Sequence, residues 1–167
     1  MAIYVFTGEG AGKTTAALGM ALRALGHDYK VIVIQFLKWW KNTGEYKIKN
    51  RLKGYEVYQF GRKGWHGLGN LDDRDKKLAE KGFEFAEKAL KRKPNLLILD
   101  ELNLALYCKL LDIDKIINFL KKTPSNIDIV ITGRNAPKEI IAIADCVNEV
   151  KIIKYPKKII TKKGISY

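Results

Sequence analysis

The chain has 167 residues, 47% of them hydrophobic, which is the length and apolar content of one globular domain over residues 1–167. No apolar run is long enough to cross a bilayer, and the sequence opens on a predicted strand without a signal-peptide pattern, so we expect a cytoplasmic protein without a membrane partner. A net charge of +13 is compatible with a nucleic-acid groove, an acidic partner or a phosphorylated substrate, and therefore selects none of them.

The first motif is a glycine-rich segment between a predicted strand and a predicted helix. Its residues are Thr7, Gly8, Glu9, Gly10, Ala11, Gly12, Lys13, Thr14 and Thr15. Glycines let backbone N–H groups face an anion, and the helix adds its positive N-terminal end. Lys13 adds a charge, and Thr14 offers a hydroxyl to Mg²⁺. The segment therefore predicts a phosphate-binding loop for a nucleoside triphosphate, one residue tighter than the common form because its first glycine is Gly8.

Strand-like and helix-like segments alternate along the rest of the chain. Helical spacing continues to Leu25 and stops at Gly26, a residue suited to a left-handed helix end. Short apolar runs predict strands over residues 31–36, 55–60, 96–99, 127–132 and 147–153. Further helices are predicted within 37–54 and over 72–92, 102–111, 114–121 and 137–144. The alternation predicts a doubly wound α/β domain with a mainly parallel sheet, of the RecA-like P-loop type.

Polar residues follow the carboxyl ends of four predicted strands, where ligands bind in such sheets. They lie at 7–15, 35–36, 100–101 and 132–134, and we expect them to meet in one crevice. Asp100 and Glu101 follow four apolar residues, as in the acidic strand that accompanies a phosphate loop and orients Mg²⁺. The pattern leaves open which of the two carboxylates faces the metal. No residue can be assigned to activate a hydrolytic water, so ATP hydrolysis is not required.

Several motifs together resemble the phosphate-loop type of cob(I)alamin adenosyltransferase, also called corrinoid adenosyltransferase. The resemblance covers nearly the whole chain. It rests on Phe6-Thr-Gly-x-Gly-x-Gly-Lys-Thr-Thr-Ala-Ala, Arg23-Ala-Leu-Gly-His, Val33-Ile-Gln-Phe-Leu-Lys, Gly44-Glu45, Leu99-Asp-Glu-Leu, Ile131-Thr-Gly-Arg-Asn-Ala-Pro, Lys154-Tyr-Pro and Lys163-Gly-Ile.

The resemblance implies a reaction between two substrates, ATP and a corrinoid. Reduced cobalt, Co(I), would attack the 5′ carbon of ATP, and tripolyphosphate would leave, with the nucleotide reversed along the loop compared with hydrolases. Lys13 and the loop backbone would hold the leaving group, and Thr14 and Glu101 would hold Mg²⁺. Arg23 is expected to contact the nucleotide. A flavoprotein reductase and a second copy of the chain are the implied protein partners.

The resemblance also implies that Trp65 lies beneath the corrin ring. Trp65 belongs to a glycine-rich segment, residues 61–69, that we expect to form a mobile loop. An aromatic residue there would displace the lower ligand and make cobalt easier to reduce. The family usually has a phenylalanine two residues before this tryptophan, and this chain has Lys63.

Other residues keep two interpretations each. Arg134 either closes a helix start or contacts phosphate, and Trp39 and Trp40 are either core or dimer contacts or corrinoid contacts. His66 is a solvated neighbour or a cobalt ligand, and the basic tail, residues 151–163, is a solvated face or a cover over an anion. The rival function is a nucleic-acid-dependent ATPase, suggested by the +13 charge and by interleaved lysine and tryptophan, although the resemblance argues against a nucleic-acid partner. A nucleotide kinase and a non-catalytic regulator are weaker alternatives.

Overall fold

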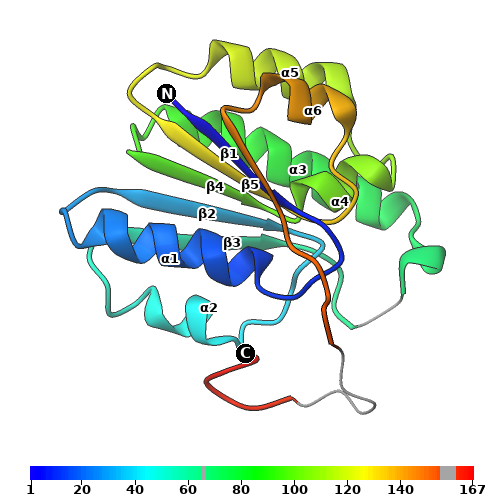
Figure 1. Ribbon diagram of the computed structural model, residues 1–167, viewed down its shortest axis with the longest axis horizontal. Coiled ribbons are helices and arrows are strands. Elements are labelled where there is room, and N and C mark those ends of the chain that lie inside the picture. Colours follow the sequence, from blue (N-terminus) through cyan, green and yellow to red (C-terminus); the bar gives the residue numbers. More distant parts are fainter. Residues whose placement is uncertain (65–66, 155–160) are drawn as a thin grey trace.

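The structure is a computed structural model that describes residues 1–64, 67–154 and 161–167. Within these residues, six strands form one sheet in the order β3-β2-β4-β5-β1-β6, and every pairing is parallel (Figure 1). The strands are β1 Ile3–Thr7, β2 Val31–Phe36, β3 Tyr55–Phe60, β4 Leu96–Asp100, β5 Asp128–Thr132 and β6 Cys146–Glu149. The predicted α/β fold with a parallel sheet is confirmed.

Helices cover both faces of the sheet (Figure 1). One face carries α1 Lys13–Leu25 and α2 Gly44–Ile48. The other carries α3 Asp73–Leu90, α4 Leu102–Tyr107, α5 Ile113–Lys122 and α6 Lys138–Ile143. A short 3₁₀ helix, η1 Leu68–Asn70, precedes α3. This two-sided arrangement is that of a doubly wound domain, and it leaves the carboxyl edge of the sheet free for the segments that follow the strands.

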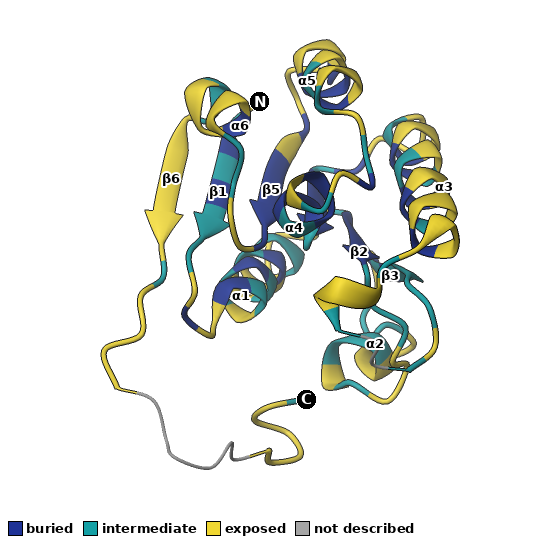
Figure 2. Ribbon diagram, turned by 90° about the vertical axis from the view of Figure 1, so that its right-hand side faces the viewer, coloured by how far each residue is buried: buried dark blue, intermediate teal, exposed yellow. Residues whose placement is uncertain are grey.

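The strand β2 shows how the sheet divides the core. All six of its residues are buried, and successive side chains point to opposite faces. Val31 and Val33 pack in the cluster that contains α1, whereas Ile32 and Ile34 pack in the cluster that contains α3. Figure 2 shows the contrast between buried β2 and β6, which is exposed along its length at the sheet edge. A strand that is buried on both faces has a continuous apolar sequence, and β2 could be predicted for that reason.

The helix α3 begins and packs as its sequence indicates. The Asp72 carboxylate accepts a hydrogen bond from the N–H of Arg74 at 2.8 Å, and Asp75 completes the capping box. The helix presents small residues to the sheet, among them Gly82. A Cβ on Gly82 would lie 2.9 Å from Cε1 of Phe36, so the close approach of α3 to β2 requires glycine there.

The predicted last strand is too long. It was expected over residues 147–153, but β6 ends at Glu149. Its partner β1 ends at Thr7, and the N–H of Val150 donates to the carbonyl of Thr7 at 2.8 Å. The chain then leaves the sheet because the carbonyl of Val150 accepts a hydrogen bond from the loop after β1 instead of from a strand.

The predicted end of α1 is correct in position but wrong in conformation. Gly26 follows the helix directly, yet its φ of −64° is right-handed. The left-handed residue is Asp28, with φ 58°, two positions later. The N–H of Tyr29 donates back to the carbonyl of Ala24 at 3.0 Å, so the chain turns toward β2 at Asp28 instead of at the glycine.

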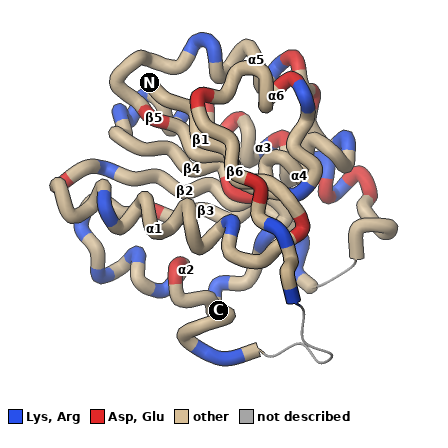
Figure 3. Tube along the Cα trace, viewed as in Figure 1, with Lys and Arg blue, Asp and Glu red and all other residues tan. Residues whose placement is uncertain are grey.

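Charges of both signs are distributed over the helical layers. Lys and Arg occur on α2, on α5 and along the chain after β6, and Asp and Glu occur beside them on α2 and α5 (Figure 3). None of the helices that the structure describes combines the length and the hydropathy needed to span a membrane.

Candidate active site

The segment that joins β1 to α1, residues 8–12, is called the glycine loop below. Gly12 has a φ of 107°, a left-handed conformation that favours glycine, and it immediately precedes the first residue of α1. Nothing lies within 4 Å of the position that a Cβ on Gly12 would take. Backbone conformation, and not lack of space, therefore explains glycine at this position.

Gly8 and Gly10 have a different role, because Val150 packs against them. The N–H of Gly10 donates to the carbonyl oxygen of Val150 at 2.7 Å. A Cβ on Gly8 would lie 2.5 Å from that oxygen, and a Cβ on Gly10 would lie 2.7 Å from Cγ1 of Val150. These two glycines therefore make room for the chain that follows β6.

Lys13 folds back onto the glycine loop. Its ammonium donates to the carbonyl oxygens of Gly8 at 2.7 Å and Gly10 at 2.6 Å, and the residue is only 7% exposed. Burial lowers the pKa of Lys13, while the negative charge of Glu101 opposes that shift. The loop and its lysine thus form one hydrogen-bonded unit at the start of α1.

Asp100, at the end of β4, accepts hydrogen bonds from residues of α1, β2 and β5 and from Lys38, which lies two residues after β2. Its Oδ1 accepts from the hydroxyls of Thr14 at 2.8 Å and Thr132 at 2.6 Å. Its Oδ2 accepts from Gln35 Nε2 at 3.0 Å and Lys38 Nζ at 2.7 Å. Burial alone would raise the pKa of Asp100, but the Lys38 ammonium and the hydroxyl donors hold it below its ordinary value. The expected meeting of the strand ends is therefore observed.

Glu101 points away from that cluster. Its φ of 63° is left-handed, and its N–H donates to Thr132 Oγ1 at 3.0 Å. The Oε2 atom is buried and has no hydrogen-bond partner among the described residues. Burial and, next, the charge of Asp100 raise the pKa of Glu101. Of the two acidic residues, Glu101 is the one whose carboxylate is free to meet a ligand.

Two cavities adjoin at Glu101. The first, of about 370 Å³, is lined by Glu9, Gly10, Ala11, Gly12, Lys13, Thr14, Glu101, Arg134 and Ile152. The second, of about 300 Å³, is lined by Leu37, Lys38, Arg62, Gly64, Gly67, Leu68, Leu71, Asp75, Glu101, Leu104 and Arg134. The first has polar walls and the glycine loop, and the second has four leucines. Glu101 and Arg134 belong to both.

Glu9 and Arg134 line the first cavity, whereas Thr7 and Thr15 are not among its lining residues. Arg134 forms an ion pair of 3.0 Å with Glu9, so the two ends of the cavity wall are linked. The hydroxyl of Thr7 accepts a hydrogen bond from the N–H of Ala136 at 3.2 Å, which ties the end of β1 to the segment before α6. Thr15 is exposed in the first turn of α1.

The structure does not bring Arg23 to this group. Arg23 is exposed in the last turn of α1, roughly 15 Å along the helix from Lys13 at 1.5 Å per residue. Trp65 and His66 lie outside the described residues. Trp40 is 40% exposed, and its ring stacks on that of Tyr167 with centroids 4.7 Å apart. Trp39 and Trp40 line a separate cavity of about 590 Å³ together with Lys63.

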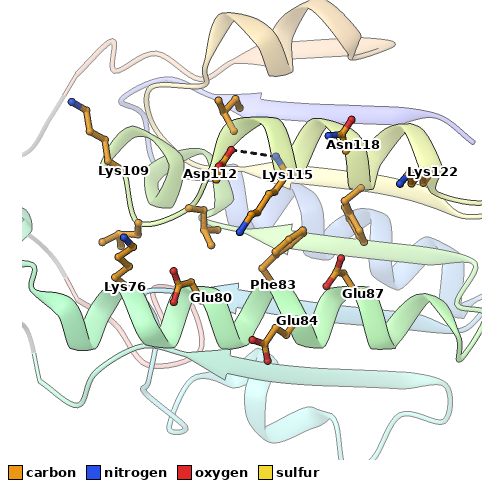
Figure 4. A pocket seen from close by; sticks show the side chains of 14 residues that line it. Lys76, Glu80, Phe83, Glu84, Glu87, Lys109, Asp112, Lys115, Asn118 and Lys122 are labelled. Carbon is orange, nitrogen blue, oxygen red and sulfur yellow. Dashed lines mark hydrogen bonds between the residues drawn. The ribbon is translucent and has the colours of Figure 1, made fainter.

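A larger cavity, of about 1000 Å³, lies between α3 and α5. Figure 4 shows Glu80, Glu84 and Glu87 on α3 and Lys115 on α5 around it, with Phe83 directed between the helices. The rings of Phe83 and Phe119 meet there edge to face at 5.5 Å. This cavity contains none of the predicted site residues, and we do not assign it to catalysis.

Two contributors to the site were not singled out from the sequence. Lys38 lies two residues after β2, at the carboxyl edge, and that position was the available signal. Val150 could not be predicted from the sequence, because it contributes through backbone atoms that contact Gly10 only in the folded chain.

The fold and the site define an α/β protein that places its candidate ligand-binding groups at the carboxyl ends of parallel strands. The family described as ATP:corrinoid adenosyltransferase BtuR/CobO/CobP matches residues 1–167. A corrinoid adenosyltransferase from Sinorhizobium sp. is 37% identical over 158 residues, covering 92% of this chain and 73% of the relative. Those of Pseudomonas aeruginosa and Escherichia coli K12 are 34% and 33% identical, over 99% and 92% of this chain and 83% and 78% of theirs. The chain belongs to the ATP:corrinoid adenosyltransferase family, and it is an enzyme of the transferase class.

Proposed function

We propose that this enzyme transfers the 5′-deoxyadenosyl group of ATP to Co(I) of a corrinoid and releases tripolyphosphate. The observation that carries the proposal is the pair of adjoining cavities that share Glu101 and Arg134. One has the glycine loop and suits a polyanion, and the other has four leucines and suits a more apolar ligand, so the two substrates would lie side by side.

In this proposal the glycine loop is a phosphate-binding loop, which makes the domain one of the P-loop type. The first turn of α1 offers N–H groups that have no partner within the helix, and Lys13 adds a positive charge. The N–H of Gly10 is already used by Val150. That N–H is therefore not available to phosphate in this conformation, and the reversed orientation of the nucleotide is carried over from the family resemblance.

The residues present also fit Mg²⁺. The buried, unpartnered Oε2 of Glu101 and the hydroxyl of Thr14 line the same cavity, and Mg²⁺ commonly binds through one or two such oxygens together with phosphates and water. We assign the metal to Thr14 and Glu101, with Asp100 behind Thr14. When bound, Mg²⁺ supplies positive charge to the triphosphate. Arg134 adds a further charge that is not buried and is free to adjust.

The second cavity is assigned to the corrinoid. Leu37, Leu68, Leu71 and Leu104 provide its apolar surface, and Gly64 and Gly67 are the described neighbours of Trp65. The cobalt electron pair would attack the 5′ carbon, the carbon–oxygen bond would break, and its electrons would leave with tripolyphosphate. Cobalt passes formally from Co(I) to Co(III). Lys13 and the first turn of α1 would stabilise the negative charge that develops on the leaving oxygens.

We extend the proposal to the cellular setting by family resemblance. The enzyme would act in the cytoplasm as a homodimer, and a flavoprotein reductase would supply the electron that makes Co(I). A nucleic-acid partner is not part of this proposal, because the family resemblance implies ATP and a corrinoid as the ligands.

Product analysis tests the proposed reaction. The protein is mixed with ATP, Mg²⁺ and chemically reduced cobalamin, and the corrin spectrum is followed for a cobalt–carbon bond. Tripolyphosphate and adenosylated corrinoid should form in equal amounts, with little ADP. ADP as the main product, or ATP consumption without a cobalt–carbon bond, refutes the proposal. Addition of a polynucleotide serves as the control for the ATPase alternative and should not accelerate ATP consumption.

A further inference from the structure

The ammonium of Lys38 bridges two groups of the candidate metal site. Its Nζ atom lies 2.7 Å from Asp100 Oδ2 and 3.1 Å from Thr14 Oγ1. The Lys38 side chain is 30% exposed, while that of Asp100 is fully buried. Thr14 in turn donates to the other carboxylate oxygen of Asp100 at 2.8 Å. Lysine, threonine and aspartate therefore form a closed triangle of hydrogen bonds.

This arrangement places a cation where nucleotide-binding sites of this kind hold a divalent one. A loop hydroxyl and the carboxylate at the end of the acidic strand are the protein groups that such sites direct at Mg²⁺. In this chain an ammonium already neutralises the carboxylate and donates to the hydroxyl oxygen. An ammonium and a divalent cation repel each other at such short distances, so they cannot both occupy this position.

Glu101, which lines the second cavity together with Lys38, has the complementary property. Glu101 carries a buried oxygen without a partner, and it adjoins the space in front of the glycine loop. A metal that arrives there with the nucleotide would use Glu101 and Thr14 and would take its remaining ligands from outside the protein, chiefly from phosphate oxygens. The part of the site at Asp100 and Thr14 thus already contains a cation, the Lys38 ammonium. The part at Glu101 lacks one.

We propose that Lys38 is a resident cation that prevents a divalent metal from binding at Thr14 and Asp100 in the nucleotide-free enzyme, so that Mg²⁺ enters only together with the triphosphate. The inference rests on the proposed function and adds an order of binding to it. Lys38 is a positioning residue: it fixes Asp100 and Thr14, and it directs the metal to the side of Glu101.

Metal binding without any substrate tests this inference. Nucleotide-free wild type and Lys38→Met are titrated with Mn²⁺, and free Mn²⁺ is measured by electron paramagnetic resonance. Removal of the ammonium leaves Asp100 as an uncompensated buried carboxylate, so Lys38→Met should bind Mn²⁺ at least about tenfold more tightly than wild type. Added Mg²⁺ should compete. Equal Mn²⁺ affinities in the two proteins overturn the inference.

Matched variants test whether the positive charge of Lys38 is what weakens Mn²⁺ binding. Lys38→Arg keeps the positive charge and should bind Mn²⁺ as weakly as wild type. Lys38→Gln removes the positive charge but keeps a hydrogen-bond donor for Asp100. Its Mn²⁺ affinity should be as high as that of Lys38→Met. Adding Asp100→Asn to Lys38→Met should abolish the gained affinity. If the gain survives Asp100→Asn, the metal binds elsewhere and the inference is wrong.

Thermal unfolding provides a second readout. Mg²⁺ without nucleotide should raise the unfolding temperature of Lys38→Met and leave that of wild type unchanged, because only the variant gains a ligand in the folded state. Neither measurement uses ATP or corrinoid, so the role of Lys38 is tested independently of the proposed adenosylation reaction. Adenosylation by wild type together with equal Mn²⁺ affinities refutes only the role of Lys38, whereas absence of a cobalt–carbon bond refutes the proposed reaction.

Discussion

The backbone N–H of Gly10 donates a hydrogen bond of 2.7 Å to the carbonyl oxygen of Val150. This bond joins the loop after β1 to the segment after β6 at the candidate active site. The N–H of Val150 donates in turn to Thr7, the last residue of β1. The shape of the glycine loop therefore depends on the docking of β6 beside β1. Mutations in either segment should affect the same site.

Gly10→Ala tests this support directly. The new methyl group would lie 2.7 Å from Cγ1 and 2.8 Å from the carbonyl oxygen of Val150, so we expect a loss of about 1–3 kcal/mol in the free energy of unfolding and a loss of nucleotide affinity. Gly19→Ala is the matched control. Its Cβ would meet nothing within 4 Å, and alanine favours α1, so it should stabilise by up to about 1 kcal/mol. Chemical unfolding measures both, and equal stability of the two variants would contradict the contact.

Lys13→Ala should impair catalysis more than folding. The ammonium that binds the Gly8 and Gly10 carbonyls is also the charge proposed to stabilise tripolyphosphate as it leaves. We expect a decrease of at least about 2 kcal/mol in transition-state stabilisation, measured as kcat/KM for adenosylation of Co(I) corrinoid. Lys121→Ala, at an exposed position on α5, is the control and should retain full activity. Near-normal turnover of Lys13→Ala would exclude the phosphate-loop assignment.

Glu101→Gln should stabilise the nucleotide-free enzyme at neutral pH. The folded-state pKa of Glu101 is raised above its ordinary value of 4.5, so the native protein binds this proton more tightly than the unfolded chain. Stability therefore falls as pH rises from 4.5 through the folded-state pKa, and glutamine removes that loss. Thermal unfolding at pH values on both sides of 4.5 should show the variant unfolding at a higher temperature at neutral pH, with the difference narrowing in acid.

The exposed residue Glu84 on α3 is the matched position for that comparison. Glu84→Gln should change the unfolding temperature at neutral pH much less than Glu101→Gln does. A Glu101→Gln variant that is less stable than wild type at neutral pH would show that the Glu101 carboxylate stabilises the fold, contrary to its unpartnered geometry.

Trp65→Ala tests the corrinoid side of the proposal. If Trp65 acts below the corrin ring and eases the reduction of cobalt, its loss should impair adenosylation of Co(II) corrinoid supplied with a reductase more than adenosylation of chemically reduced Co(I). Tyr107→Ala, at an exposed position on α4, is the control and should retain activity with both cobalt states. Equal losses with both cobalt states in Trp65→Ala would count against the role.

Much of the fold was readable from the sequence, because its signals are local. Buried strands such as Val31–Phe36 are continuous apolar runs, and the helix predicted over 72–92 is observed as α3, Asp73–Leu90. The glycine loop and the acidic pair after Leu99 could be predicted for the same reason. The end of β6 could not, because it is set by hydrogen bonds to the loop after β1.

The sequence by itself determined which residue types stand at the carboxyl edge of the sheet, and this sufficed to indicate the family. Only the tertiary structure decided their roles. The left-handed conformation of Glu101 turns its side chain toward the cavities, while Asp100 is enclosed by donors from separate segments, among them Lys38. Arg23 belongs to a motif near the loop in sequence but lies at the far end of α1. Side-chain direction and long-range contact depend on how the elements pack, and no local pattern encodes either.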